Sequence, residues 1–188
     1  TSLYNHYFKV GITATGSLDP NTTDGAFTAS SPHPIITYYE NQLILAEAQA
    51  RLGVTDKALD ALNSVRKGLA SGYINGKTIS ATGLKYDAYT LSDFAPTGLA
   101  NPTKLATVQT ALLYEIISQR YIFLLMQYEA FNDVRRLEKA TPVVQLPIPL
   151  YTGTKKPERF IYPQNEVNTN PNVPKPLPDQ FTKIPIFQ

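Results

Sequence analysis

The side chains best suited to chemistry are aromatic and polar residues that alternate between positions 69 and 100. A sugar ring presents apolar C–H faces that stack on tyrosine or phenylalanine, while amides and carboxylates hydrogen-bond to its hydroxyls. The alternative is that these aromatic residues anchor the stretch onto neighbouring helices, and the sequence leaves both interpretations open. The predicted ligand-binding set is Tyr73, Asn75, Tyr86, Asp87, Tyr89 and Phe94.

The residue patterns that catalysis requires are missing from the sequence. His6 and His33 are the only histidines, and neither has a companion at a metal-ligand or triad spacing. No Gly-x-Ser-x-Gly sequence or glycine-rich phosphate loop occurs, and the chain has no cysteine. Glu40 and Glu47 can share one helix face, but such acids are more often surface or hairpin-bridging charges. We therefore expect no enzyme activity, no metal and no cofactor.

Composition and charge narrow the class of protein. The chain has 188 residues, of which 43% are hydrophobic, so it can bury the core of one domain. Its 17 basic and 15 acidic side chains are scattered, without the basic patch that binds nucleic acid. The most apolar stretch, 111–126, contains Glu115 and Arg120, which are costly in hydrocarbon, and so predicts a buried helix. We expect both charges to have partners elsewhere in the fold.

Two helices joined by a short turn are predicted within residues 34–68. Apolar residues recur at three- and four-residue spacing over 36–52, and Gly53 then ends the first helix. Thr55 is the expected N-cap of the second helix, which Gly68 ends. The turn is so short that the helices must fold back on each other. The result is an antiparallel hairpin of tetratricopeptide-like size.

A longer and more apolar helix is predicted in residues 101–140. Pro102 suits a first helical turn, and from Leu105 the apolar face broadens until the helix is hydrophobic nearly all round. Such a helix belongs in the middle of a bundle. A shorter helix should follow over 128–139, because Pro142 forbids further continuation.

The carboxy-terminal part of the chain has a different composition. Residues 141–188 hold ten of the fifteen prolines, yet keep apolar and aromatic side chains that a disordered tail would lack. We predict an extended segment that wraps over the helices. Ion pairs of Asp133, Arg135 and Arg136 should join the short helix to this segment.

Together these elements predict a mainly all-α fold in a single domain. A lone helical hairpin cannot bury its own apolar face, so we expect more helical structure to pack against it. The predicted segments of the 1–188 domain are irregular turns and short strands in 1–33, the hairpin in 34–68, a long irregular loop in 69–100, helices in 101–140 and the extended wrap in 141–188.

Four short segments occur in an order that is typical of one protein family. They are 37–53, with TYYE and LAEAQARLG; 58–66, ending in LNSVR; 119–136, with QRY and EAFNDVRR; and 159–171, beginning with RFIYP. Each segment alone could belong to other helical proteins, whereas the ordered set resembles the SusD/RagB family of nutrient-binding proteins. The last two segments are the more specific ones.

The resemblance implies the carboxy-terminal portion of a longer lipoprotein of the bacterial outer membrane. Such a protein lies at the cell surface, lipid-anchored through a segment outside this sequence. It captures oligosaccharide, or in some members peptide, for polysaccharide utilisation. The implied partners are a glycan ligand, a SusC-like TonB-dependent transporter and the missing amino-terminal part of the same protein. The alternative is a helical-repeat, tetratricopeptide-like adaptor that binds other proteins, which the hairpin in 34–68 suggests.

Overall fold

The protein is described by a computed structural model. The chain divides into two compact units, 1–37 and 38–188, and all that follows concerns the second unit. The predicted turns and strands of 1–33, together with His6 and His33, lie outside the described residues. The structure describes residues 35–71, 73–74, 77–78, 86–124, 127–146, 153 and 155–184.

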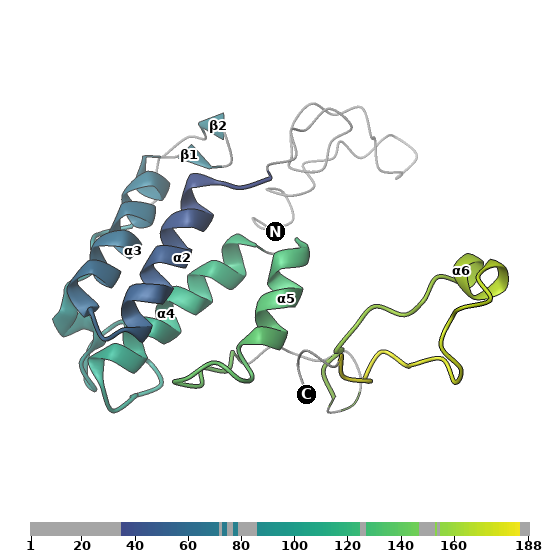
Figure 1. The fold of residues 1–188 in the computed structure, drawn as a ribbon. Coiled ribbons are helices and arrows are strands. Elements are labelled where there is room, and N and C mark those ends of the chain that lie inside the picture. Colours follow the sequence, from purple (N-terminus) through teal and green to yellow (C-terminus); the bar gives the residue numbers. More distant parts are fainter. Residues whose placement is uncertain are drawn as a thin grey trace, which may run out of the picture. The chain divides into compact units, whose positions relative to one another are not determined.

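In the described ranges the fold is mainly α-helical, which confirms the predicted class (Figure 1). A short antiparallel strand pair and one 3-10 helix lie in the stretch that was predicted to be a loop. In chain order the elements are α2 (Tyr38–Arg51), α3 (Thr55–Ala70), β1 (Tyr73–Ile74), β2 (Lys77–Thr78), η1 (Leu91–Phe94), α4 (Val108–Phe123), α5 (Tyr128–Arg136) and α6 (Gln164–Thr169).

The helices α2 and α3 form the predicted antiparallel hairpin, side by side in Figure 1. Alanines on the facing sides, such as Ala46 and Ala58, are completely buried and let the two helix axes approach closely. Gly53 follows α2 with φ +79°, a left-handed conformation that favours glycine at a helix end. The predicted N-cap was wrong by one residue. Val54 occupies the N-cap without a side-chain hydrogen bond, and Thr55 is the first residue of α3.

The sequence predicted that α3 ends at Gly68. This prediction was wrong, because the helix continues to Ala70. The ring of Tyr39 on α2 lies directly over Gly68. A Cβ atom at this position would approach the Tyr39 hydroxyl oxygen to 2.3 Å. Tyr39 is itself held edge-to-face against Phe123, with ring centroids 5.4 Å apart. Glycine is therefore needed here for close helix packing inside an unbroken helix.

The apolar helix α4 begins later than predicted. Its N-cap is Thr107, whose hydroxyl oxygen accepts from the amide of Thr110 at 3.1 Å. Leu105 lies before the helix, because its amide donates to Asn101 Oδ1 at 2.8 Å in a separate turn. Pro102 belongs to this turn and not to a first helical turn. The body of α4 is deeply buried, and the helix contacts both α2 and α3.

The helix α5 begins at Tyr128, as predicted, but ends at Arg136 instead of Lys139. In the described residues of the proline-rich segment, 141–146, 153 and 155–184, the one helix is α6, which has 6 residues and was not predicted. Two parts of this segment meet where the Gln180 carbonyl accepts from the amides of Glu158 (2.8 Å) and Arg159 (3.3 Å). Residues between these points therefore form a closed loop.

Candidate functional site

Five charged side chains join α2, α4 and α5. Glu47 accepts hydrogen bonds from Arg51 Nε (2.9 Å) and from Arg136 Nη1 (2.7 Å) and Nη2 (2.9 Å). Asp133 accepts from Arg136 Nη2 at 3.0 Å and also from Arg120 Nε. The bonds of Arg136 to Glu47 and of Arg120 to Asp133 are charge-assisted and connect different helices. Arg120 therefore has the partner that the sequence led us to expect.

Electrostatics in this charge cluster favours the ionised form of Glu47. Burial alone would raise the pKa of Glu47, but hydrogen bonds and charge from Arg136 and Arg51 outweigh it and lower that pKa. Glu47 is thus a buried bridge from α2 to α5, not a surface charge or a link within the hairpin. Asp133 and Arg136 likewise connect α5 to other helices, whereas we had expected a connection to the proline-rich segment. That connection comes from Arg51 Nη1, which donates to the Thr141 carbonyl at 2.9 Å.

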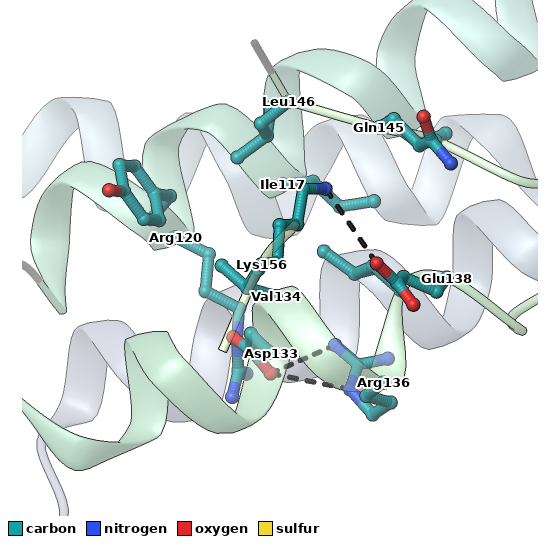
Figure 2. A pocket seen from close by; sticks show the side chains of 12 residues that line it. Ile117, Arg120, Asp133, Val134, Arg136, Glu138, Gln145, Leu146 and Lys156 are labelled. Carbon is teal, nitrogen blue, oxygen red and sulfur yellow. Dashed lines mark hydrogen bonds and ion pairs between the residues drawn. The ribbon is translucent and has the colours of Figure 1, made fainter. Parts of the chain in front are cut away.

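A small pocket adjoins the charge cluster between α4 and α5 (Figure 2). Figure 2 shows Asp133 and Arg136 directed toward each other, while Lys156 reaches across to Glu138, with Nζ and Oε1 3.9 Å apart. The free volume inside is about 10 Å³. A space of that size holds roughly one water molecule. The pocket therefore contributes to packing and has no room for a nutrient.

Tyr89, a predicted ligand residue, is fixed to α3 through both its backbone and its ring. Its amide donates to Asn63 Oδ1 (2.8 Å), and Asn63 Nδ2 donates to its carbonyl (2.9 Å). The Arg66 guanidinium lies 3.7 Å from the ring centroid, as a cation–π contact. The hydroxyl donates to Glu115 Oε1 at 3.2 Å, which gives Glu115 its expected partner. Burial and the charge of Glu115 raise the pKa of Tyr89.

Phe94 is completely buried, with 0% of its surface exposed. Its ring packs edge-to-face on Tyr89, with centroids 5.2 Å apart. A ring without an exposed face cannot stack on a sugar, so Phe94 leaves the candidate ligand set. For these two aromatic residues the structure favours the alternative interpretation, in which they anchor the loop onto the helices.

The structure describes the other four predicted residues to different extents. The Tyr86 ring centroid lies 5.9 Å from the Arg66 guanidinium, and the Asp87 carbonyl accepts from Arg66 Nε at 2.8 Å. The Asp87 side chain is exposed. For Tyr73 the structure describes only the backbone, which belongs to β1. Asn75 lies outside the described residues. Ligand binding by these four residues stays a prediction.

An aromatic cluster that the sequence analysis missed lies on α5. We define it as Tyr128, Phe131 and Phe160. Tyr128 is 73% exposed and Phe160 is 65% exposed. The Phe160 ring lies 4.8 Å from that of Phe131 and 6.0 Å from that of Tyr128, centroid to centroid. The cluster therefore offers large ring surfaces to solvent that are held in place by one another.

The two faces of α5 explain why these rings are exposed. Ala130, Asp133 and Leu137 are buried against the rest of the fold. Tyr128 and Phe131 lie on the other side of the helix, because neighbours on one face are three or four residues apart. The closure of the proline-rich loop at Gln180 fixes the backbone next to Phe160, which directs this ring onto α5.

Polar groups flank the aromatic cluster. The exposed Asn132 lies four residues after Tyr128 on the same helix face. The Arg135 guanidinium lies 5.2 Å from the Phe131 ring centroid. A carboxamide group hydrogen-bonds to hydroxyls, and exposed rings stack on apolar C–H faces. The arrangement thus has the parts that sugar recognition requires.

A signal for this cluster was present in the sequence. Tyr128, Phe131 and Arg135 occur at positions i, i+3 and i+7 of a predicted helix, and Phe160 belongs to an aromatic run among prolines. Both segments were used for secondary structure, ion pairs and the family resemblance, and their aromatic residues were not interpreted as a ligand surface. Which helix face is free became clear only from the burial of Asp133 on the opposite side.

Two further findings concern the described ranges alone. They contain no group of three or more histidine, cysteine, aspartate or glutamate side chains that could hold a metal ion. They also contain no helix that is both long and apolar enough to cross a membrane.

No protein-family model, no curated protein and no solved structure matches the chain. The class that its fold and site define is a mainly α-helical protein with an exposed aromatic surface. Its function is therefore inferred from the geometry above and from the motifs in the sequence.

Proposed function

We propose that the protein captures oligosaccharide without altering it, and that the aromatic cluster is the contact surface. The observation that carries this proposal is the exposure of Tyr128 and Phe160 as mutually supported rings beside polar side chains. Large aromatic side chains cost free energy when they are exposed to water. A stacked sugar ring would recover part of that cost while its hydroxyls stay hydrogen-bonded.

The wider role that we propose is nutrient capture at the bacterial cell surface. The protein would hand its ligand to a SusC-like TonB-dependent transporter in the outer membrane, to which it would be lipid-anchored as part of a longer polypeptide. The four ordered sequence segments that resemble SusD/RagB proteins support this role. A peptide ligand remains within the proposal, since exposed rings and amides suit both ligand classes. The step is binding and release, with no covalent chemistry.

Isothermal titration against a panel of oligosaccharides and peptides tests the proposal. We expect binding to at least one oligosaccharide, and loss of at least tenfold in affinity in the double variant Tyr128→Ala, Phe160→Ala. A tenfold loss corresponds to about 1.4 kcal/mol, within the range of one lost stacking contact. Leu99→Ala is the matched control, because Leu99 is also an exposed apolar side chain but lies outside the cluster.

Several results would overturn the proposal. Affinity that is unchanged in the double variant would remove the aromatic cluster as the site. Turnover of a bound ligand would contradict capture without chemistry. Absence of binding to every member of the panel would count against nutrient capture as a whole.

A second candidate function is the protein-binding adaptor, and a groove between α2 and α3 favours it. The groove has a volume of about 290 Å³. It is lined by Gln42, Leu45, Gln49, Lys57, Asp60, Ala61 and Ser64. Carboxamides can donate to and accept from a peptide backbone. Fluorescence anisotropy with labelled peptides separates the two functions, because an adaptor would lose affinity in Gln49→Ala and keep it in the aromatic double variant.

A further inference from the structure

The two helices of the hairpin have very different outer faces. In α3 every exposed residue is charged, as is usual for a helix face in water. In α2 no exposed residue is charged, and large apolar side chains predominate. The exposed residues of α3 are Asp56, Lys57, Asp60 and Lys67, and those of α2 are Tyr38, Asn41, Ile44, Leu45 and Ala48.

The apolar side chains on the outer face of α2 form a regular stripe. Tyr38, Leu45 and Leu52, which follows the helix, are spaced by seven residues and are 61%, 44% and 76% exposed. Over the 14 residues of α2 the stripe is about 21 Å long, at 1.5 Å per residue. A seven-residue apolar repeat is the pattern by which one helix packs along another. Charged residues of α2 do not interrupt it, because Glu47 and Arg51 are held in ion pairs with each other and with α5, and Glu40 is half-buried outside the stripe.

We propose that this outer face of α2 is a self-association surface, on which a second copy of the chain packs its own α2 in the antiparallel direction. Charge supports this occupant. The exposed residues of α2 carry no charge, so this face can meet itself without repulsion between like charges. Residues at the centre of protein interfaces are likewise depleted in charge and enriched in aromatic side chains.

The order of side chains along α2 also suits a two-fold axis at Leu45. Tyr38 and Leu52 are equally distant from Leu45 in sequence. Tyr38 of each copy would therefore contact Leu52 of the other copy, at both ends of the interface. Asn41 would face the partner's Gln49, and each carboxamide can donate to and accept from the other. The face is therefore complementary to itself.

The groove between α2 and α3 enlarges the available contact. The groove, which has a volume of about 290 Å³, lies beside the apolar stripe, and Leu45 belongs to both. A stable interface requires roughly 800 Å² from each partner, more than one helix face of this length supplies. Side chains of the second copy can occupy the groove, which extends the contact to α3.

Disulfide trapping gives a direct test, because the chain has no cysteine. Leu45→Cys places one thiol per copy next to the two-fold axis, where a disulfide needs Cα atoms roughly 4.4–6.8 Å apart. We expect this full-length variant to form covalent dimers under mild oxidation. Leu99→Cys is the matched control, since Leu99 is 93% exposed but distant from α2 in sequence, and it should stay mostly monomeric.

The unmodified chain supplies a second measurement that does not depend on any substitution. Sedimentation analysis over a concentration series should show a monomer–dimer equilibrium. Leu45→Arg should shift the dissociation constant upward by at least tenfold at unchanged helical circular dichroism.

Three outcomes would overturn the proposal. The first is a chain that stays monomeric at all concentrations, or a dimer that Leu45→Arg leaves intact. The second is equal trapping of the Leu45→Cys and Leu99→Cys variants. The third is a monomer in which the thiol introduced by Leu45→Cys resists maleimide, which would mean that another part of the same polypeptide covers α2. Glycan binding in the titration above is independent of all three.

Discussion

Neutralising Glu47 is expected to destabilise the fold strongly, because this carboxylate connects the helical hairpin to α5. The change Glu47→Gln keeps the shape of the side chain and removes its charge. It removes the negative charge of the group that now accepts three hydrogen bonds from the Arg136 and Arg51 guanidiniums, and leaves Asp133 as the acidic partner of Arg136. Loss of one member of a buried ion pair is costly because the remaining charge stays poorly solvated.

The magnitude follows from how well water can replace the lost partner. Removing one member of a buried pair costs roughly 3–5 kcal/mol. The Glu47 side chain is only 7% exposed, but that of Arg136 is 41% exposed and can be partly rehydrated. We therefore expect the free energy of unfolding to fall by about 2–3 kcal/mol, at or just below the lower end of that range. For a chain of this size the midpoint temperature should fall by roughly 4–12 °C.

Urea unfolding followed by circular dichroism measures the effect, with Asp60→Asn as the matched control. Asp60 is an exposed acid on α3, so its neutralisation should change the free energy of unfolding by less than about 0.5 kcal/mol. A double-mutant cycle with Arg136→Gln isolates the pair, and the coupling should be about 1–3 kcal/mol.

The pH dependence gives an independent check on the sign. The pKa of Glu47 in the folded state is lowered from its usual value of 4.5. Its contribution to stability is therefore complete above that value and is lost as the pH falls through the folded-state pKa. The difference between wild type and Glu47→Gln should narrow in acid. A difference below about 0.5 kcal/mol at neutral pH, or one that stays constant into acid, would refute the reasoning.

Three more predictions concern packing and ionisation. Leu112→Ala should lower the free energy of unfolding by about 2–5 kcal/mol in urea titrations, because Leu112 is completely buried in α4. Gly68→Ala should lower it by about 1–3 kcal/mol, because the new methyl group meets the buried Tyr39 ring, and a value near zero would contradict the close helix approach. The raised pKa of Tyr89 predicts that stability falls as the pH rises above the usual 10.0, and Tyr89→Phe should flatten that fall in alkaline unfolding curves.

The sequence predicted the helices better than their ends. Periodic apolar residues locate α2, α3 and α4, because burial of one face is the main source of helix stability in proteins. The ends depend on contacts that local sequence does not contain. Gly68 stays helical because Tyr39, from another helix, occupies the space beside it. Leu105 stays outside α4 because the Asn101 side chain holds a separate turn.

Prediction of the candidate site was limited for the same reason, because it too depends on contacts that local sequence does not contain. Aromatic residues mixed with polar ones indicate either a ligand surface or a buried anchor, and only burial distinguishes the two. Phe94 and Tyr89 pack onto the helices, whereas Tyr128 and Phe160 have similar side chains and are exposed. Sequence spacing could place Tyr128 and Phe131 on one helix face, but the contribution of Phe160 required the fold.

The closure of the proline-rich loop at Gln180 makes the position of Phe160 in the aromatic cluster independent of the loop that follows it in the sequence. The amides of Glu158 and Arg159, which fix the backbone beside Phe160, both donate to the Gln180 carbonyl. The conformation of 161–178 therefore need not affect the aromatic cluster. The entropic cost of a closed loop grows only slowly with its length. The loop can therefore gain or lose residues, or accept a fluorescent reporter, while the binding surface keeps its geometry. Evolution and protein engineering have the same freedom at this place.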